Sequence, residues 1–226
     1  MSGPTGDEVA AVYAACADRI AGIAPSLDDA QLATPVPATP KWTVIELLCH
    51  LVGGPADVCA GRLDGVATDP WTQAQVEARH GRSVAELLEE WSGLREQIDG
   101  VCRSGMAPAL AFDVATHEQD LRGALDLGRI PDPVSLDLVT SGLAAGAVGR
   151  SRKAELPSLQ LRDGDGWSVG DGGGVSLTAP KFELFRLMMG RRSGRQAAAM
   201  DWSGDPSPYL DLLCPFGPLR DSDVHD

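Results

Sequence analysis

The stretch "FDVATHEQDLRG", residues 112–123, decides how the first half of this chain folds. Read as an α-helix at about 100° per residue, it places Asp113, His117 and Asp120 on one stripe, within roughly 60° of one another. Apolar residues flank this stripe, so it lies on the side of the helix that should pack inward. The opposite side is predicted to be solvated and carries Glu118, Gln119, Arg122 and Asp126.

Such a stripe cannot be buried without partners, because an unpaired polar group in an apolar interior costs several kcal/mol. Its members must therefore pair with neighbours, bind an ion or face a cavity. An Asp and a His four residues apart on a helix can reach the same cation, which then needs a further ligand from another segment. Asp120 lies one turn beyond His117. It can orient the His117 side chain, act as a base, or form a hydrogen bond to a neighbouring helix.

The histidines narrow the choice of a third ligand. The chain has four of them, and His80 and His225 are predicted to be exposed. His50 falls on the apolar face of a predicted helix, so it also looks inward. Periodicity leaves two alternatives open: separate core histidines that each make one hydrogen bond, or a convergent set of His50, Asp113 and His117. Two imidazoles and one carboxylate suit zinc or another divalent transition metal, and three ligands leave a position open, as in catalytic sites.

Composition excludes several classes of partner. The 226 residues carry a formal net charge of −13, which argues against binding to nucleic acid or to an anionic membrane. The five cysteines are odd in number and form no CxxC pair, so a reducing cytoplasm is the expected location. The first residues lack the pattern of a signal peptide, and no long apolar run predicts a membrane span.

Apolar spacing and helix-start signals divide the chain into elements. Thr43 with Glu46, and Ser83 with Glu86, fit the capping box that begins a helix. Helices are predicted at residues 7–23, 43–63, 84–102, 112–128 and 134–150, with a loop at 64–82. Near residue 153 the chain becomes rich in Gly and Asp, which predicts small antiparallel strands and tight turns, followed by short helices. The fold is therefore expected to be mainly α, with a helical domain at 1–152 and a small α+β domain at 153–226.

Two quoted segments resemble a known family. "KWTVIELLCHLVGG", residues 41–54, resembles the Trp–Thr/Ser–Val and Leu…His–Leu signature in the second helix of DinB-like four-helix bundles. "FDVATHEQDLRGALDLG", residues 112–128, resembles their acid-x-x-x-His-x-x-Asp segment. The order of parts, including the tail "LMMGRRSGRQ", is similar to the actinobacterial mycothiol-dependent maleylpyruvate isomerase family. There a DinB-like bundle of up-down-down-up type precedes a small α+β domain similar to sterol-carrier domains.

The resemblance implies a metal site and a thiol cosubstrate. The family's ligands fall on His50, Asp113 and His117, and the metal is usually Zn²⁺. The middle ligand departs from the family pattern, which commonly has Glu where this chain has Asp113. Mycothiol would be the cosubstrate, used as a thiol to be transferred to a small electrophile or to assist cis–trans isomerisation of a small unsaturated acid.

Further residues take roles in the same scheme. Asp120 is predicted to assist the ligands, and Arg191 or Arg195 to bind a substrate carboxylate. In the alternative, the positive charges of these arginines only complement the C-terminus of the preceding helix. For the whole chain, the alternative to an enzyme is a protein of the same fold that binds metal or a thiol conjugate without turnover. A monomer or homodimer is expected.

Overall fold

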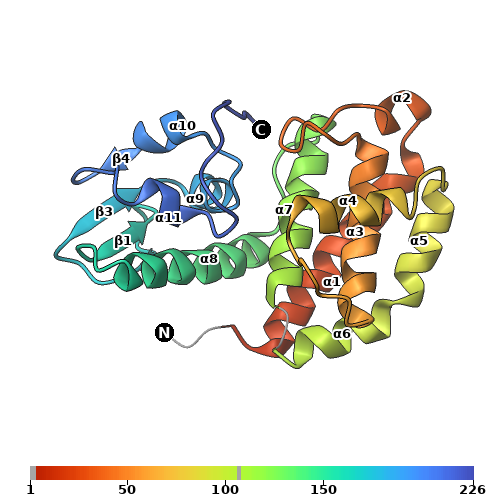
Figure 1. Cartoon of the computed structure of the whole chain (residues 1–226), viewed down its shortest axis with the longest axis horizontal. Coiled ribbons are helices and arrows are strands. Elements are labelled where there is room, and N and C mark those ends of the chain that lie inside the picture. The colour runs from red at the N-terminus through yellow and green to blue at the C-terminus, as the bar shows by residue number, and fades with distance from the viewer. Residues whose placement is uncertain (1–3, 106–107) are drawn as a thin grey trace. The chain divides into compact units, whose positions relative to one another are not determined.

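The computed structural model describes residues 4–105 and 108–226, which divide into two compact units (Figure 1). Unit 1 comprises the residues up to Pro131, together with Asp226, and unit 2 comprises Asp132–His225. The helices of unit 1 are α1 (Gly6–Ile23), η1 (Ala24–Ser26), α2 (Asp29–Leu32), α3 (Val44–Cys59), α4 (Asp69–Glu77), α5 (Val84–Gly93), α6 (Arg95–Arg103) and α7 (Pro108–Ala124).

Both predicted capping boxes begin a helix of unit 1. The carboxylate of Glu46 accepts a hydrogen bond of 2.7 Å from the backbone N–H of Thr43, directly before α3. The carboxylate of Glu86 does the same for Ser83 at 2.7 Å, directly before α5. These bonds satisfy amide groups that have no partner inside the helix, so they fix where each helix starts.

The bundle of unit 1 is formed by α1, α3, the α5–α6 pair and α7. Helix α1 packs along α7 and α6, and α3 packs against α5 and α7 (Figure 1). Their shared interior is apolar and includes Ile20, Leu47, Leu51, Ile98 and Leu121, each at most 2 % exposed. The prediction of a mainly helical fold built on a four-helix bundle and followed by a small α+β part is confirmed.

Two elements of unit 1 differ from the prediction. The predicted loop at 64–82 contains α4, because Pro70 occupies the first turn of that helix, where the missing N–H of proline costs nothing. The single helix predicted at 84–102 is two helices, α5 and α6. They meet at Leu94, whose backbone N–H bonds to the carbonyl of Trp91 three residues earlier instead of four.

Unit 2 combines a long helix with a small sheet. Its elements are α8 (Pro133–Lys153), β1 (Leu159–Arg162), β2 (Ser168–Val169), β3 (Val175–Thr178), α9 (Lys181–Met188), α10 (Gly194–Ala198), β4 (Asp201–Trp202) and α11 (Leu210–Leu213). Helix α8 packs on β1, β2 and α9. The contacts therefore place α8 with unit 2, whereas the sequence assigned it to a helical domain ending at residue 152.

The sheet corrects the expectation of purely antiparallel strands. Its order is β2-β1-β3-β4, and β1 pairs with β3 in parallel. The Gly-rich segment between β2 and β3 crosses to the other side of β1 instead of forming a hairpin. Gly174 permits this crossing, since a Cβ there would lie 2.1 Å from the carbonyl oxygen of Ser158. Within the described residues, no helix has the length and apolar character needed to span a membrane.

Candidate metal centre

Helices α3 and α7 bring His50, Asp113 and His117 together inside unit 1. Nε2 of His50 lies 3.5 Å from Oδ2 of Asp113, and Nε2 of His117 lies 3.5 Å from Oδ1 of the same carboxylate. All three potential ligand atoms lie within 4.8 Å of one another. Both histidines are buried, while the Asp113 side chain is 36 % exposed, so solvent reaches the cluster at the carboxylate.

The opposite ring nitrogens of the two histidines are held by short hydrogen bonds. Nδ1 of His50 lies 2.8 Å from Oε1 of Gln75, and Nδ1 of His117 lies 2.9 Å from Oδ2 of Asp120. Both partners are acceptors, so each Nδ1 carries the proton and each Nε2 presents a lone pair toward Asp113. This is the arrangement in which a histidine ligates a metal through Nε2.

The distances on the two sides of each imidazole differ. Hydrogen bonds between imidazole and carboxylate would bring N and O to about 2.8 Å, as on the Nδ1 sides. The two Nε2–oxygen distances of 3.5 Å are longer and close to the separation of about 3.4 Å between ligand atoms around a tetrahedral zinc ion. The donor set and its spacing therefore fit a divalent transition metal.

Trp42 lies against one side of the two imidazoles. Its ring centroid is 4.9 Å from that of His50 and 6.1 Å from that of His117. The two imidazoles meet edge to face, with centroids 4.9 Å apart and planes at 81°. The indole thereby shields both rings from water on that side and limits their rotation.

Charge in the cluster favours an ionised ligand. Desolvation raises the pKa of Asp113, but the facing imidazoles of His50 and His117 outweigh it and hold that pKa far below its usual range. Burial lowers the pKa of His117, and Asp113 and then Asp120 raise it by more, so the net shift is upward.

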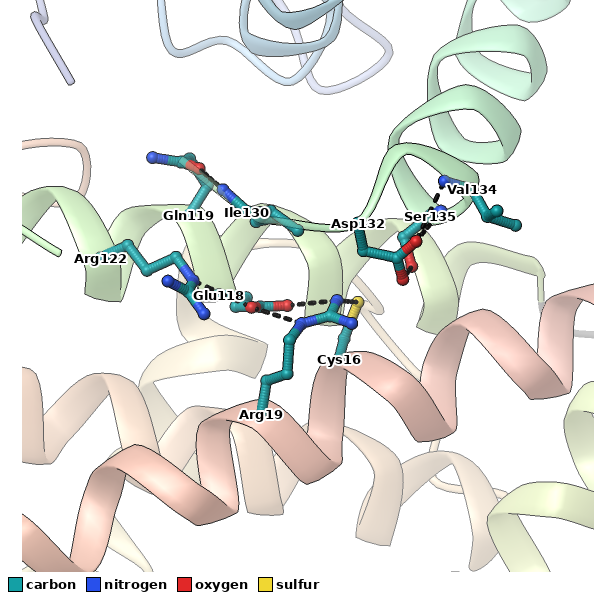
Figure 2. A network of polar contacts seen from close by, with 9 residues as sticks. All are labelled: Cys16, Arg19, Glu118, Gln119, Arg122, Ile130, Asp132, Val134 and Ser135. Atoms are coloured by element: carbon teal, nitrogen blue, oxygen red, sulfur yellow. Dashed lines mark hydrogen bonds and ion pairs between the residues drawn. The ribbon is translucent and has the colours of Figure 1, made fainter. Parts of the chain in front are cut away.

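A buried ion-pair network holds α7 against α1 beside this cluster. Figure 2 shows Arg19 of α1 reaching the carboxylate of Glu118, with Arg122 on its other side. Glu118 is fully buried, and so is Gln119, whose Oε1 accepts the backbone N–H of Ile130 at 3.0 Å. The prediction that this side of the helix is solvated is wrong for these two residues, because Arg19 of α1 pairs with Glu118 and the segment around Ile130 bonds to Gln119.

Comparison with known proteins identifies the first part of the chain. Residues 13–109, a little under half of the chain, match the family described as the mycothiol maleylpyruvate isomerase N-terminal domain. This segment is therefore similar to the N-terminal domain of that family. The family resemblance drawn from the two histidine segments is thus confirmed. His50 and Trp42 lie inside the matched range, and Asp113 and His117 lie just beyond it.

Solved structures extend the likeness of fold beyond the matched residues. A crystal structure of the mycothiol-dependent maleylpyruvate isomerase aligns with a TM-score of 0.55 at 13% sequence identity, covering 90% of this chain and 96% of that one. A crystal structure of a histidine-to-alanine mutant of that enzyme aligns with a TM-score of 0.54 at 12% identity and the same coverage. At such identity the alignments show the fold alone. No curated protein sequence matches the chain.

The remaining predicted site residues take the following positions. Asp120 is buried behind His117 in the bundle of unit 1, which favours the orienting role over that of a base. Arg191 and Arg195 lie in unit 2, where Nη1 of Arg191 donates to the carbonyl of Met189 and Arg195 pairs with Asp223. Within unit 1, the structure thus brings Asp120 into contact with the candidate ligand His117.

The other two histidines do not belong to this cluster. His80 and, at the other end of the chain, His225 are exposed, as predicted. An apolar hollow of about 120 Å³ lies between α1, α5 and α6, and none of its lining residues belongs to the candidate metal set. It is bordered by Tyr13 and Trp91, which bond to each other through the indole N–H at 2.9 Å.

Sequence reasoning missed Gln75 and the position of Trp42. Gln75 lies in the segment predicted to be a loop, so its burial could not be expected. A signal was present in the adjacent glycines Gly53 and Gly54 of α3. Two adjacent glycines in a helix also permit another segment to approach closely, and α4 does so here.

Proposed function

We propose that this protein is a divalent-metal-dependent enzyme that uses mycothiol as a thiol cosubstrate. The carrying observation is the convergence of three ligand atoms whose histidine tautomers are already set for metal binding. The family of its N-terminal domain and the names of its structural neighbours support mycothiol as the thiol. The substrate would be a small electrophile, such as a short unsaturated acid.

His50, Asp113 and His117 would hold the metal, and zinc suits this donor set best. When bound, such a metal lowers the pKa of a coordinated thiol, so that the thiol is delivered as thiolate near neutral pH. Asp113 is the partly exposed ligand, which makes its side of the cluster the natural approach for a cosubstrate. Trp42 keeps water from the imidazoles, and Asp120 fixes the orientation of His117.

Two reaction outcomes share this arrangement. A thiolate that adds to a conjugated cis double bond allows rotation about that bond and then leaves, which is isomerisation. A thiolate that displaces a leaving group, or remains attached, gives S-transfer. The ligand set serves both, so we infer the class of chemistry and leave both reactions within the proposal.

Location and substrate anchoring follow from the same proposal. The five cysteines are free, which suits a reducing cytoplasm where a thiol cosubstrate stays reduced. We infer that Arg191 or Arg195 binds a substrate carboxylate. Both side chains already have acceptors within unit 2, so this role would require an exchange of partners. The protein would act as a monomer or homodimer.

Metal analysis tests the first step of this proposal. Protein purified without chelator should contain close to one equivalent of zinc, and His117→Ala should hold less than about a tenth of that. His80→Ala is the matched control, since His80 is an exposed histidine of the same unit. Equal metal content in all three proteins would refute the site.

Thiol consumption then separates an enzyme from a binding protein. The zinc-loaded protein should convert mycothiol and a panel of small electrophiles to adducts or isomers, detected by mass spectrometry, and His117→Ala should not. The shorter carboxylate of Asp113 favours the alternative, a protein that binds metal or a thiol conjugate without turnover. Thermal stabilisation by mycothiol without any thiol consumption would support that alternative.

A further inference from the structure

We propose that Gln75 is a positioning residue for the candidate ligand His50, and that Asp57 holds Gln75 in turn. This inference rests on the proposed metal site. Helix α4 supplies no ligand, but through Gln75 it would orient one. The relay runs from Asp57 through the Gln75 amide to Nδ1 of His50.

The hydrogen bonds of the relay have a single consistent direction. Nε2 of Gln75 donates to Oδ2 of Asp57 at 3.0 Å, and the other oxygen of Asp57 pairs with Arg62 at 2.7 Å. A carboxylate only accepts, so the amide must turn its NH₂ toward Asp57 and its Oε1 toward His50. Oε1 can only accept as well, which places the proton of His50 on Nδ1. The lone pair of Nε2 is thereby directed at Asp113.

The packing around Gln75 leaves this amide little freedom. Gln75 is 2 % exposed, and a Cβ at Gly53 of α3 would lie 2.5 Å from its own Cβ. The carbonyl of Gln75 accepts a bond of 3.3 Å from Nη1 of Arg79, and Arg79 pairs with Glu90 of α5. Helix α4 is thus tied to both α3 and α5, and the side chain it presents to His50 is fixed in position.

The two histidines are supported by different chemistry. Asp120 supports His117 with a carboxylate, whereas Gln75 supports His50 with a neutral amide. Asp113 would supply one negative charge directly to a dication, and Asp120 supplies a second from behind His117; the charge of Asp57 is one hydrogen bond further away than that of Asp120. An amide at position 75 therefore orients its histidine without adding a third negative charge beside the metal.

Zinc affinity of the full-length chain tests the role of Gln75. We expect Gln75→Leu, which removes the acceptor, to weaken zinc binding about 10- to 100-fold in a competition titration with a chromophoric chelator. Gln97→Leu is the matched control, since Gln97 is exposed on α6, and its affinity should stay within about twofold. Equal affinity of Gln75→Leu and the wild type would overturn the proposal.

A compensating double variant distinguishes positioning from general packing. Gln75→Glu alone would bring two carboxylates together and should weaken zinc binding. Gln75→Glu combined with Asp57→Asn restores every donor and acceptor of the relay, because the new amide donates and the new carboxylate accepts from both sides. We expect the double variant to recover most of the lost affinity, and no recovery would overturn the relay.

A readout on the zinc-free protein separates this proposal from the proposed function. Nitrogen-15 NMR of the imidazoles should show His50 with its proton on Nδ1 in the wild type and a mixture of tautomers in Gln75→Leu. If the wild type binds no zinc, the proposed function fails, and this measurement still decides whether Gln75 sets the tautomer. An unchanged tautomer in Gln75→Leu would refute the positioning role.

Discussion

The guanidinium of Arg19 donates two hydrogen bonds of 2.8 Å, from Nε and Nη2, to the carboxylate of Glu118. This pair connects α1, the first helix of the bundle, to α7, the last. Glu118 is fully buried and also pairs with Arg122. Because the residue directly follows His117, this pair also anchors the helix that carries two of the candidate ligands.

Glu118→Gln should therefore destabilise unit 1 strongly. Replacing the buried carboxylate leaves two guanidinium groups without their shared anion, and breaking a buried pair in this way costs about 3 kcal/mol. Urea unfolding should show this loss, whereas Glu89→Gln, at an exposed glutamate of α5, should change stability by less than about 0.5 kcal/mol. A loss for Glu118→Gln as small as that of the control would show that the pair adds little.

Asp113→Glu should weaken zinc binding, even though Glu is common at this position in the family the chain resembles. The carboxylate of Asp113 already lies at the spacing of metal ligands, 3.5 Å from each imidazole. One more methylene would carry it about 1.5 Å further toward the rings, into the space of the ion. A chelator competition titration should give lower affinity for Asp113→Glu and still lower affinity for Asp113→Ala. A gain in affinity for Asp113→Glu would contradict this account.

The stabilisation by zinc should increase as pH rises above about 6.5, the ordinary pKa of histidine. The pKa of His117 is raised in the folded, metal-free protein, so its protonation stabilises that form below the unfolded pKa and the effect disappears as pH rises through the folded pKa. Zinc needs the same nitrogen free of protons, so its binding strengthens over the same range. The difference in Tm between zinc-loaded and chelated protein should therefore widen with pH, and a constant or narrowing difference would contradict the ligand role of His117.

The cysteines of the native protein should react slowly with alkylating agents. Burial raises the pKa of the Cys49 and Cys102 thiols to about 11, so few thiolates exist at ordinary pH. Cys59 is the partly exposed exception. Iodoacetamide at about pH 8 should modify Cys59 first, as judged by mass spectrometry, while denatured protein should react at all five positions. Fast labelling of Cys49 in the native state would refute this.

The sequence predicted those features that depend on local pattern. Helix starts at Thr43 and Ser83 followed from side chains three residues away, and the inward placement of His50 and His117 followed from helical period. The candidate ligand set itself needed either the family resemblance or the structure, because period shows which side of a helix a residue occupies and not what it faces.

Features that depend on distant partners escaped prediction. Glu118 was expected in solvent because its partner Arg19 lies 99 residues away in sequence. The parallel pairing of β1 and β3 was missed because β2 separates them along the chain and then adds to the other edge of β1. Gln75 was missed for two reasons. Its helix, α4, was predicted to be a loop, and its partner His50 lies in another helix, α3.

The candidate ligands come from α3 and α7, two helices separated by much of the first unit's sequence. A bound ion would therefore crosslink α3 and α7. It would slow unfolding of unit 1, because unfolding has to separate these two helices. Metal-free copies would open more often and be cut sooner by proteases. The cellular lifetime of this protein would then follow zinc supply, independently of how fast any copy turns over its substrate.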